Sequence, residues 1–157
     1  MDTETAATAD RRAMHPLLER LVELCGATVL GAADLDAWGS QPGAALLAFT
    51  EDPVLYRETL DLAVIVPELA QALPGRFRIG VLLPAAARAA APRYGFRRWP
   101  ALVLLKDGRY VGAIDGLREW QAYVEELSRL LAAEPTRPPT IGIAVAADRH
   151  AAARGCH

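Results

Sequence analysis

The chain has 157 residues, 52% of them hydrophobic, and 17 Lys and Arg against 19 Asp and Glu give a formal net charge of −2. This length fits one domain with a single core. The charge argues against a nucleic-acid-binding protein, which usually carries a strong basic excess. No apolar run reaches the ~20 residues that a membrane span needs, so we expect neither a nucleic-acid partner nor membrane insertion.

The first 13 residues are predicted to be a disordered arm, because they are small, polar and aperiodic. Arg11 and Arg12 are not followed by an apolar stretch, so the arm does not have the pattern of a secretory or twin-arginine signal. Two cysteines, Cys25 and Cys156, do not suggest a disulfide framework. The expected compartment is therefore the cytoplasm.

The first part of the domain is predicted to alternate between helix and strand. Leucines and valines recur at helical spacing over residues 15–24, and Gly26 follows as a stop. Residues 27–30 could form a short strand. Residues 32–43 indicate a helical turn, with Asp34 as a possible cap, and then a loop rich in Gly and Pro.

The middle of the chain carries the clearest buried strand. The run AALLAF at 44–49 is continuously apolar, as expected of a central strand that is buried on both faces. Residues 50–53 follow as a loop. Residues 55–73 have helical character, with Pro67 inside, and Pro74-Gly75 ends that segment.

The second half is predicted to end in a hairpin and a helix. A strand over 76–83 is followed by an alanine-rich helix over 84–95. Strands 101–105 and 109–114 surround Asp107-Gly108, a strong hairpin signal. An amphipathic helix covers 117–131. After residue 134 the composition shifts to PTRPPT and alanine, which predicts a mobile tail over 134–157.

This order of elements predicts an α/β domain over 14–133. Helices join parallel strands in the first half, and an antiparallel hairpin closes the second half. The result is a mixed central sheet flanked by helices that ends in a hairpin and a helix, which is the thioredoxin order. A flavodoxin-like sheet, the alternative, would not end in a tight hairpin before its last helix.

The segment PRYGFRRWPALVLLKDGRYVGAIDG (92–116) resembles the C-terminal half of thioredoxins, and 44–83 resembles their central strand, helix and next strand. The resemblance implies a cis bond between Trp99 and Pro100, beside the position of the redox cysteines. The expected cysteine stretch, TEDPVLYRETLDLAVIV at 50–66, holds no cysteine, and Ala48 replaces a buried acid. Thiol exchange needs a low-pKa thiolate and a resolving partner, so dithiol chemistry is not expected.

A narrower resemblance covers about residues 15–131. EDPVLYRETLDLAVIVPEL (51–69), the 94–116 segment and the helix start around Trp120 resemble hydrogenase expression proteins of the HyaE/HupG type. These are thioredoxin-like proteins of [NiFe]-hydrogenase operons that lack the cysteine pair. The resemblance implies maturation of the hydrogenase small subunit, with binding of its twin-arginine signal peptide before export.

Two interpretations of the replaced redox stretch remain open. The stretch carries several Asp and Glu residues, and Glu68 extends this acidic series. The series is either a solvated loop and helix face or an acidic rim for a basic peptide. In the same way, LAVIV at 62–66 is either core or the wall of an apolar groove beside Trp99. On the peptide interpretation, carboxylates bind the arginines and the apolar residues bind the stretch after them. The candidate residues are Glu51, Asp52, Glu58, Asp61, Trp99 and Pro100.

No catalytic, metal or cofactor site is expected. Cys25 is interpreted as a thiol at the core edge, and Cys156-His157 cannot complete a four-ligand metal site alone. Arginines crowd the second half as a solvated surface or as a surface for an acidic partner: Arg76, Arg78, Arg88, Arg93, Arg97 and Arg98.

The sequence thus favours a non-catalytic accessory chaperone that binds the hydrogenase small-subunit precursor. The rivals are a scaffold for other maturation proteins and a thiol oxidoreductase that uses Cys25 alone.

Overall fold

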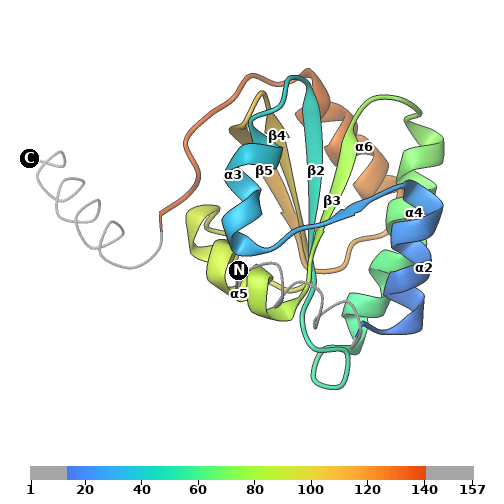
Figure 1. Cartoon of the computed structure of the whole chain (residues 1–157). Helices are drawn as coiled ribbons and strands as arrows, with labels where there is room; N and C mark the ends of the chain where they lie inside the picture. The colour runs from blue at the N-terminus through green and yellow to red at the C-terminus, as the bar shows by residue number, and fades with distance from the viewer. Residues whose placement is uncertain (1–13, 141–157) are drawn as a thin grey trace, which may run out of the picture.

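A computed structural model describes residues 14–140 and shows one mixed five-stranded sheet (Figure 1). The spatial order is β1-β3-β2-β4-β5. β3 is parallel to both β1 and β2, whereas β4 is antiparallel to both β2 and β5. The strands are β1 (Thr28–Val29), β2 (Ala44–Phe49), β3 (Arg78–Leu82), β4 (Ala101–Lys106) and β5 (Arg109–Asp115).

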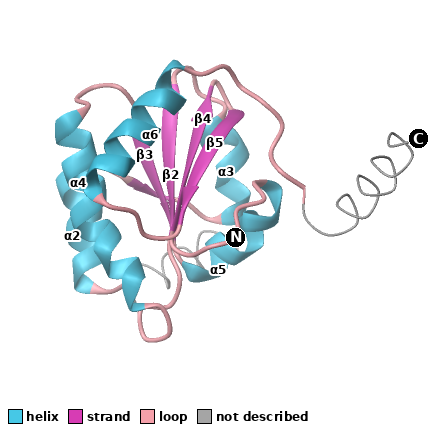
Figure 2. Ribbon diagram, turned by 180° about the vertical axis from the view of Figure 1, so that it is seen from behind, coloured by secondary structure: helices cyan, strands magenta, loops and turns pink. Residues whose placement is uncertain are grey.

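Helices cover both faces of the sheet (Figures 1 and 2). α2, α4 and α6 pack on one face, and α3 and α5 lie on the other. Short 3-10 turns precede α3 and α4 and follow α5. The α-helices are α2 (Pro16–Cys25), α3 (Leu35–Gly39), α4 (Leu62–Ala72), α5 (Pro84–Ala90) and α6 (Trp120–Ala132).

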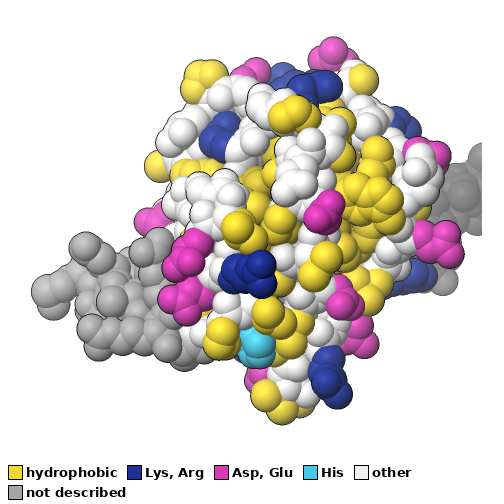
Figure 3. Space-filling model, turned by 90° about the vertical axis from the view of Figure 1, so that its right-hand side faces the viewer, with side chains coloured by type: hydrophobic (Ala, Val, Ile, Leu, Met, Phe, Trp, Pro, Cys, Tyr) yellow, Lys and Arg dark blue, Asp and Glu magenta, His cyan; other side chains and the backbone are white. Residues whose placement is uncertain are grey.

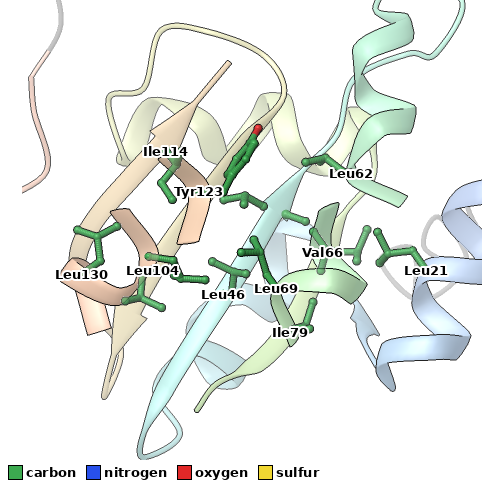
Figure 4. Close-up of a cluster of buried hydrophobic side chains, with 14 of the residues drawn as sticks. Leu21, Leu46, Leu62, Val66, Leu69, Ile79, Leu104, Ile114, Tyr123 and Leu130 are labelled. Carbon is green, nitrogen blue, oxygen red and sulfur yellow. The ribbon is translucent and has the colours of Figure 1, made fainter. Parts of the chain in front are cut away.

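β2 is the centre of the molecule, as its continuous apolar run predicts. It pairs with β3 on one side and β4 on the other, and its residues after Ala44 are all buried. Leu46 points into the core under α4 and α6, where it meets Leu69 and Leu104 (Figure 4). Leu47 and Phe49 face the second core, under α3 and α5. A strand with apolar side chains on both faces is therefore buried by two helical layers.

Two local expectations are confirmed only in part. The predicted helix over 55–73 becomes an α-helix only at Leu62, and residues 57–61 form a 3-10 turn. The Thr59 hydroxyl in that turn accepts a hydrogen bond from the backbone N–H of Glu51, which holds the chain in a tight turn. Asp34 does not cap α3 with its side chain; its carboxylate accepts from the Gly31 N–H instead.

The first residues of the predicted mobile tail lie against the domain. The N–H of Thr136 donates to the Tyr110 carbonyl at 2.8 Å, and Pro139 packs over Gly95, where a Cβ would lie 2.1 Å from the Pro139 carbonyl oxygen. Residues 134–140 thus extend the domain past the expected boundary at 133. The predicted arm, 1–13, and the rest of the predicted tail lie outside the described residues. Between residues 14 and 140, no helix is long and apolar enough to cross a membrane.

Arg78, one of the crowded arginines, ties β3 to the turn before β2. Its Nη2 donates to the carbonyls of Trp38 (2.8 Å), Gly39 (3.2 Å) and Gln41 (3.1 Å), and its guanidinium stacks 4.7 Å from the Trp38 ring centroid. The interpretation of all these arginines as a solvated surface is wrong for Arg78, because its planar fork closes the end of α3.

We expect Arg78→Ala to lower the free energy of unfolding by about 2–3 kcal/mol, because it removes charge-assisted hydrogen bonds to several carbonyls. Urea denaturation measures the change. Arg76→Ala, at an exposed position nearby, is the matched control and should change stability by less than about 0.5 kcal/mol. Equal effects of the two substitutions would contradict this role for Arg78.

Candidate functional site

Three loops meet at one end of the sheet. Phe49 pairs with Ala101, and Ala101 pairs with Asp115, so β2 ends, β4 begins and β5 ends at the same level. The loop after β2, the segment before β4 and the connection to α6 are therefore neighbours. Sequence reasoning placed the missing redox site in the first of these loops and the expected cis-proline in the second.

The Trp99-Pro100 bond is cis, which confirms the expectation. The backbone N–H groups of Arg97 and Arg98 donate to the Asp115 carboxylate at 2.9 and 3.1 Å. The N–H of Gly116 donates to the Pro100 carbonyl at 2.8 Å. Pro100 is buried and Trp99 is half-buried.

Aromatic rings support this segment from below. Phe49 makes edge contacts with Tyr94, Phe96 and Trp99, at centroid distances of 5.7, 5.0 and 6.4 Å, a geometry that aromatic pairs prefer. The segment that contains Trp99-Pro100 therefore has a rigid base. Of these four aromatic rings, only Trp99 is partly exposed.

Glu51 does not lie on an exposed rim, which corrects the expectation for this residue. It is only 6% exposed. Its carboxylate accepts hydrogen bonds from the Arg88 guanidinium, with Nε at 2.9 Å and Nη2 as the second donor, and from the Asp52 N–H at 2.8 Å. These contacts, above all those of Arg88, lower the pKa of Glu51 against the opposing effect of burial. Sequence analysis placed Arg88 among the crowded arginines but missed its pairing with Glu51, because 37 residues separate the partners.

The turn after Glu51 presents apolar side chains to solvent. The Asp52 carboxylate accepts from the Val54 N–H at 2.9 Å, and the Asp52 carbonyl accepts from the N–H groups of Leu55 and Tyr56. Val54 is 86% exposed and Leu55 is 72% exposed, with Tyr56 beside them. We call Val54, Leu55 and Tyr56 the apolar tip. Its side chains protrude from a hydrogen-bonded turn, a surface that typically marks an interaction site.

Glu58 and Asp61 are exposed, as the acidic-rim interpretation requires. Residues three apart in a 3-10 turn lie above one another, so the two carboxylates share one side. Leu62, the residue after Asp61, packs in the same core cluster as Tyr123 of α6. The Tyr123 hydroxyl donates to the Gly116 carbonyl at 3.1 Å. Asp61 therefore lies toward the connection to α6.

The apolar run 62–66 lies mostly in the core, as one of the two interpretations expects. Leu62 and Val66 are buried, and Ala63 and Ile65 pack partly against the same core. Within this run only Val64, 65% exposed, faces outward. Figure 3 shows apolar side chains gathered on this side of the molecule, over α2 and α4, with acidic groups around them.

Cys25 lies far from the three loops. Cys25 is the last residue of α2, a helix of ten residues that is about 15 Å long. The first residues of α2 lie close to Asp52, near the three loops. Burial raises the pKa of the Cys25 thiol, which opposes thiolate chemistry. Cys156 lies outside the described residues. Within 14–140, no group of three His, Cys, Asp or Glu is placed to hold a metal ion.

Comparison with known proteins identifies the family. The family described as "Hydrogenase-1 expression protein HyaE" matches residues 17–123. The chain belongs to the HyaE family. Hydrogenase expression/formation protein HoxO of Cupriavidus necator is 41% identical over 147 residues, which cover 92% of this chain and 90% of that protein. HupG of Bradyrhizobium diazoefficiens is 36% identical over 71% of this chain and 74% of its own length.

The fold expectation is confirmed as well. A mutant thioredoxin from Halobacterium salinarum is 26% identical, has a TM-score of 0.55, and covers 69% of this chain and 93% of its own length. This HyaE-family protein therefore has a thioredoxin-like fold and a role in hydrogenase maturation.

The ion pair of Glu51 predicts a pH-dependent stability. Because the folded-state pKa of Glu51 is lowered, its contribution is present above the ordinary pKa near 4.5 and is lost as pH falls through the folded value. Glu51→Gln should therefore unfold more easily than the parent at pH 7, and the difference should shrink below about pH 4. Thermal unfolding from pH 7 to pH 3 measures it, and a difference that stays constant would contradict the pair.

Proposed function

We propose that this protein is a non-catalytic accessory chaperone of [NiFe]-hydrogenase maturation. It binds the small-subunit precursor through the twin-arginine signal peptide, in the cytoplasm before export. The observation that carries the proposal is the loop at the thioredoxin redox position, which presents an apolar tip and carboxylates in place of thiols. The family match supports the maturation role.

The loop offers the groups that recognition of such a peptide needs. Asp52, Glu58 and Asp61 are at least partly exposed, and none of them forms an ion pair with another residue of the described range. Carboxylates bind guanidinium groups through paired hydrogen bonds. The apolar tip supplies surface for the stretch that follows the arginines. Glu51 acts indirectly, since it holds the N–H of Asp52.

A scaffold for other maturation proteins is the second candidate. Leu117, in the connection before α6, and Trp120, the first residue of α6, are exposed. Such residues suit a contact with a folded protein. The two candidates differ in whether an isolated signal peptide binds.

We expect charge reversal at Glu58 and Asp61 to abolish most of the peptide affinity. Each exposed ion pair contributes only ~0.2–1 kcal/mol, so loss of one carboxylate should weaken binding a few-fold. Glu58→Lys with Asp61→Lys turns attraction into repulsion and should weaken it more than tenfold. Calorimetric titration with a hydrogenase small-subunit signal peptide measures both, and added salt should weaken the parent's binding.

The matched control is Glu19→Lys with Glu23→Lys, the same charge change on the exposed face of α2, which should bind within about twofold of the parent. A peptide with Lys-Lys in place of Arg-Arg should bind weakly, and a peptide with Gln-Gln should hardly bind at all. Parent-like binding by the Glu58/Asp61 variant would refute this site. Failure of the parent to bind any precursor would replace the chaperone by the scaffold.

We also expect no reductase activity. Because burial raises the pKa of Cys25, a Cys156→Ser protein should react with a disulfide reagent at pH 8 several-fold more slowly than glutathione does. Insulin reduction should stay at background. A reductase rate in the parent that disappears in the Cys25→Ser, Cys156→Ser double variant would make the oxidoreductase rival correct.

A further inference from the structure

A cavity of about 640 Å³ opens beside the apolar tip. Its walls come from three elements: the start of α2, the turn after Glu51, and the junction of β3 with α5. This volume is typical of a ligand site. The apolar lining includes Leu18, Val54, Leu83 and Ala85.

The apolar wall is held open by the backbone. Leu18 and Leu83 are buried and form the floor. Val54 stands at the mouth and is kept there by the hydrogen bond from its N–H to the Asp52 carboxylate. A side chain that is exposed yet fixed loses little conformational entropy on binding. The cavity is therefore prepared for an apolar ligand.

The polar groups of the cavity leave a negative charge. His15, Asp52 and Arg88 line it. Nδ1 of His15 accepts a hydrogen bond from the Leu17 N–H at 3.1 Å. Arg88 is paired with Glu51, and Asp52 lies near enough to raise the pKa of Arg88 further. Glu51 already neutralises Arg88, and Asp52 has no ion-pair partner among the described residues, so an apolar ligand that also carries a cation fits best.

We infer that this cavity binds an apolar peptide segment whose preceding basic residue lies against Asp52. The inference rests on the proposed function, because a twin-arginine signal has this order of basic and apolar residues. The apolar part of the peptide therefore binds this cavity and not residues 62–66, which belong to the core. The occupant enters between Val54 and Ala85, with its aliphatic side chains on Leu18 and Leu83.

Two substitutions test the cavity without touching the core. Val54→Ser removes apolar surface at the mouth and should weaken binding about fivefold. Ala85→Trp, at an exposed position of α5, fills the entrance and should weaken it more than tenfold. Val64→Ser is the matched control: Val64 is similarly exposed but lies outside the lining. The probes are a hydrogenase small-subunit signal peptide and a synthetic peptide of two arginines followed by leucines and alanines.

Thermal unfolding first confirms that each variant folds like the parent. If both cavity variants lose affinity for the signal peptide and Val64→Ser does not, the inference holds. If the parent binds the signal peptide and both variants bind it equally well, the cavity is wrong while the proposed function stands.

If the parent binds only the synthetic peptide, and the cavity variants lose it, the cavity is correct and the proposed function is wrong. Binding of neither peptide overturns both. If the cavity variants leave peptide binding unchanged but abolish a dimer seen by ultracentrifugation, a second copy of the chain is the occupant and the inference fails.

Discussion

The carboxylate of Glu51 is the fixed point on which the site depends. It joins α5, through Arg88, to the N–H of Asp52, while the N–H of Glu51 itself donates to Thr59. These bonds hold the loop after β2 to the end of the sheet and to the 3-10 turn. The apolar tip protrudes because the backbone below it is satisfied. A loop fixed in this way presents one surface, and a partner need not order it on binding.

The pKa of the same carboxylate bears on the proposed non-catalytic role. A catalytic acid or base works best with a pKa near the operating pH. The hydrogen bonds from Arg88 lower the pKa of Glu51, away from neutral pH. Ala48, one of the most buried residues, carries no acidic group. The only described cysteine, Cys25, is a helix length away. Each of these features favours a binding surface over proton or thiol chemistry.

Local patterns predicted most of the fold but less of the site. The apolar run of β2 and the Asp107-Gly108 hairpin carry their structure in short stretches, so the strands were predictable. The cis bond at Trp99-Pro100 was predicted by the resemblance to thioredoxins. The partnership of Glu51 with Arg88 depends on distant elements, and no local signal encodes it. The same contacts explain why α4 begins later than predicted. The Thr59 hydroxyl accepts from the N–H of Glu51, so residues 57–61 form a 3-10 turn and α4 begins at Leu62. The run 62–66 is ambiguous by periodicity alone, since core and groove wall are equally apolar.

The order of groups around the apolar tip has a consequence for any bound peptide. The tip lies between Asp52, beside the cavity, and the 3-10 turn that carries Glu58 and Asp61. A peptide that contacts both acidic positions must cross the tip. Because Asp52 forms no hydrogen bond or ion pair with Glu58 or Asp61 in the described structure, the contributions of the two positions should be nearly additive for one spanning ligand. A ligand confined to one side would respond to that side alone, so additivity distinguishes one extended groove from two separate surfaces.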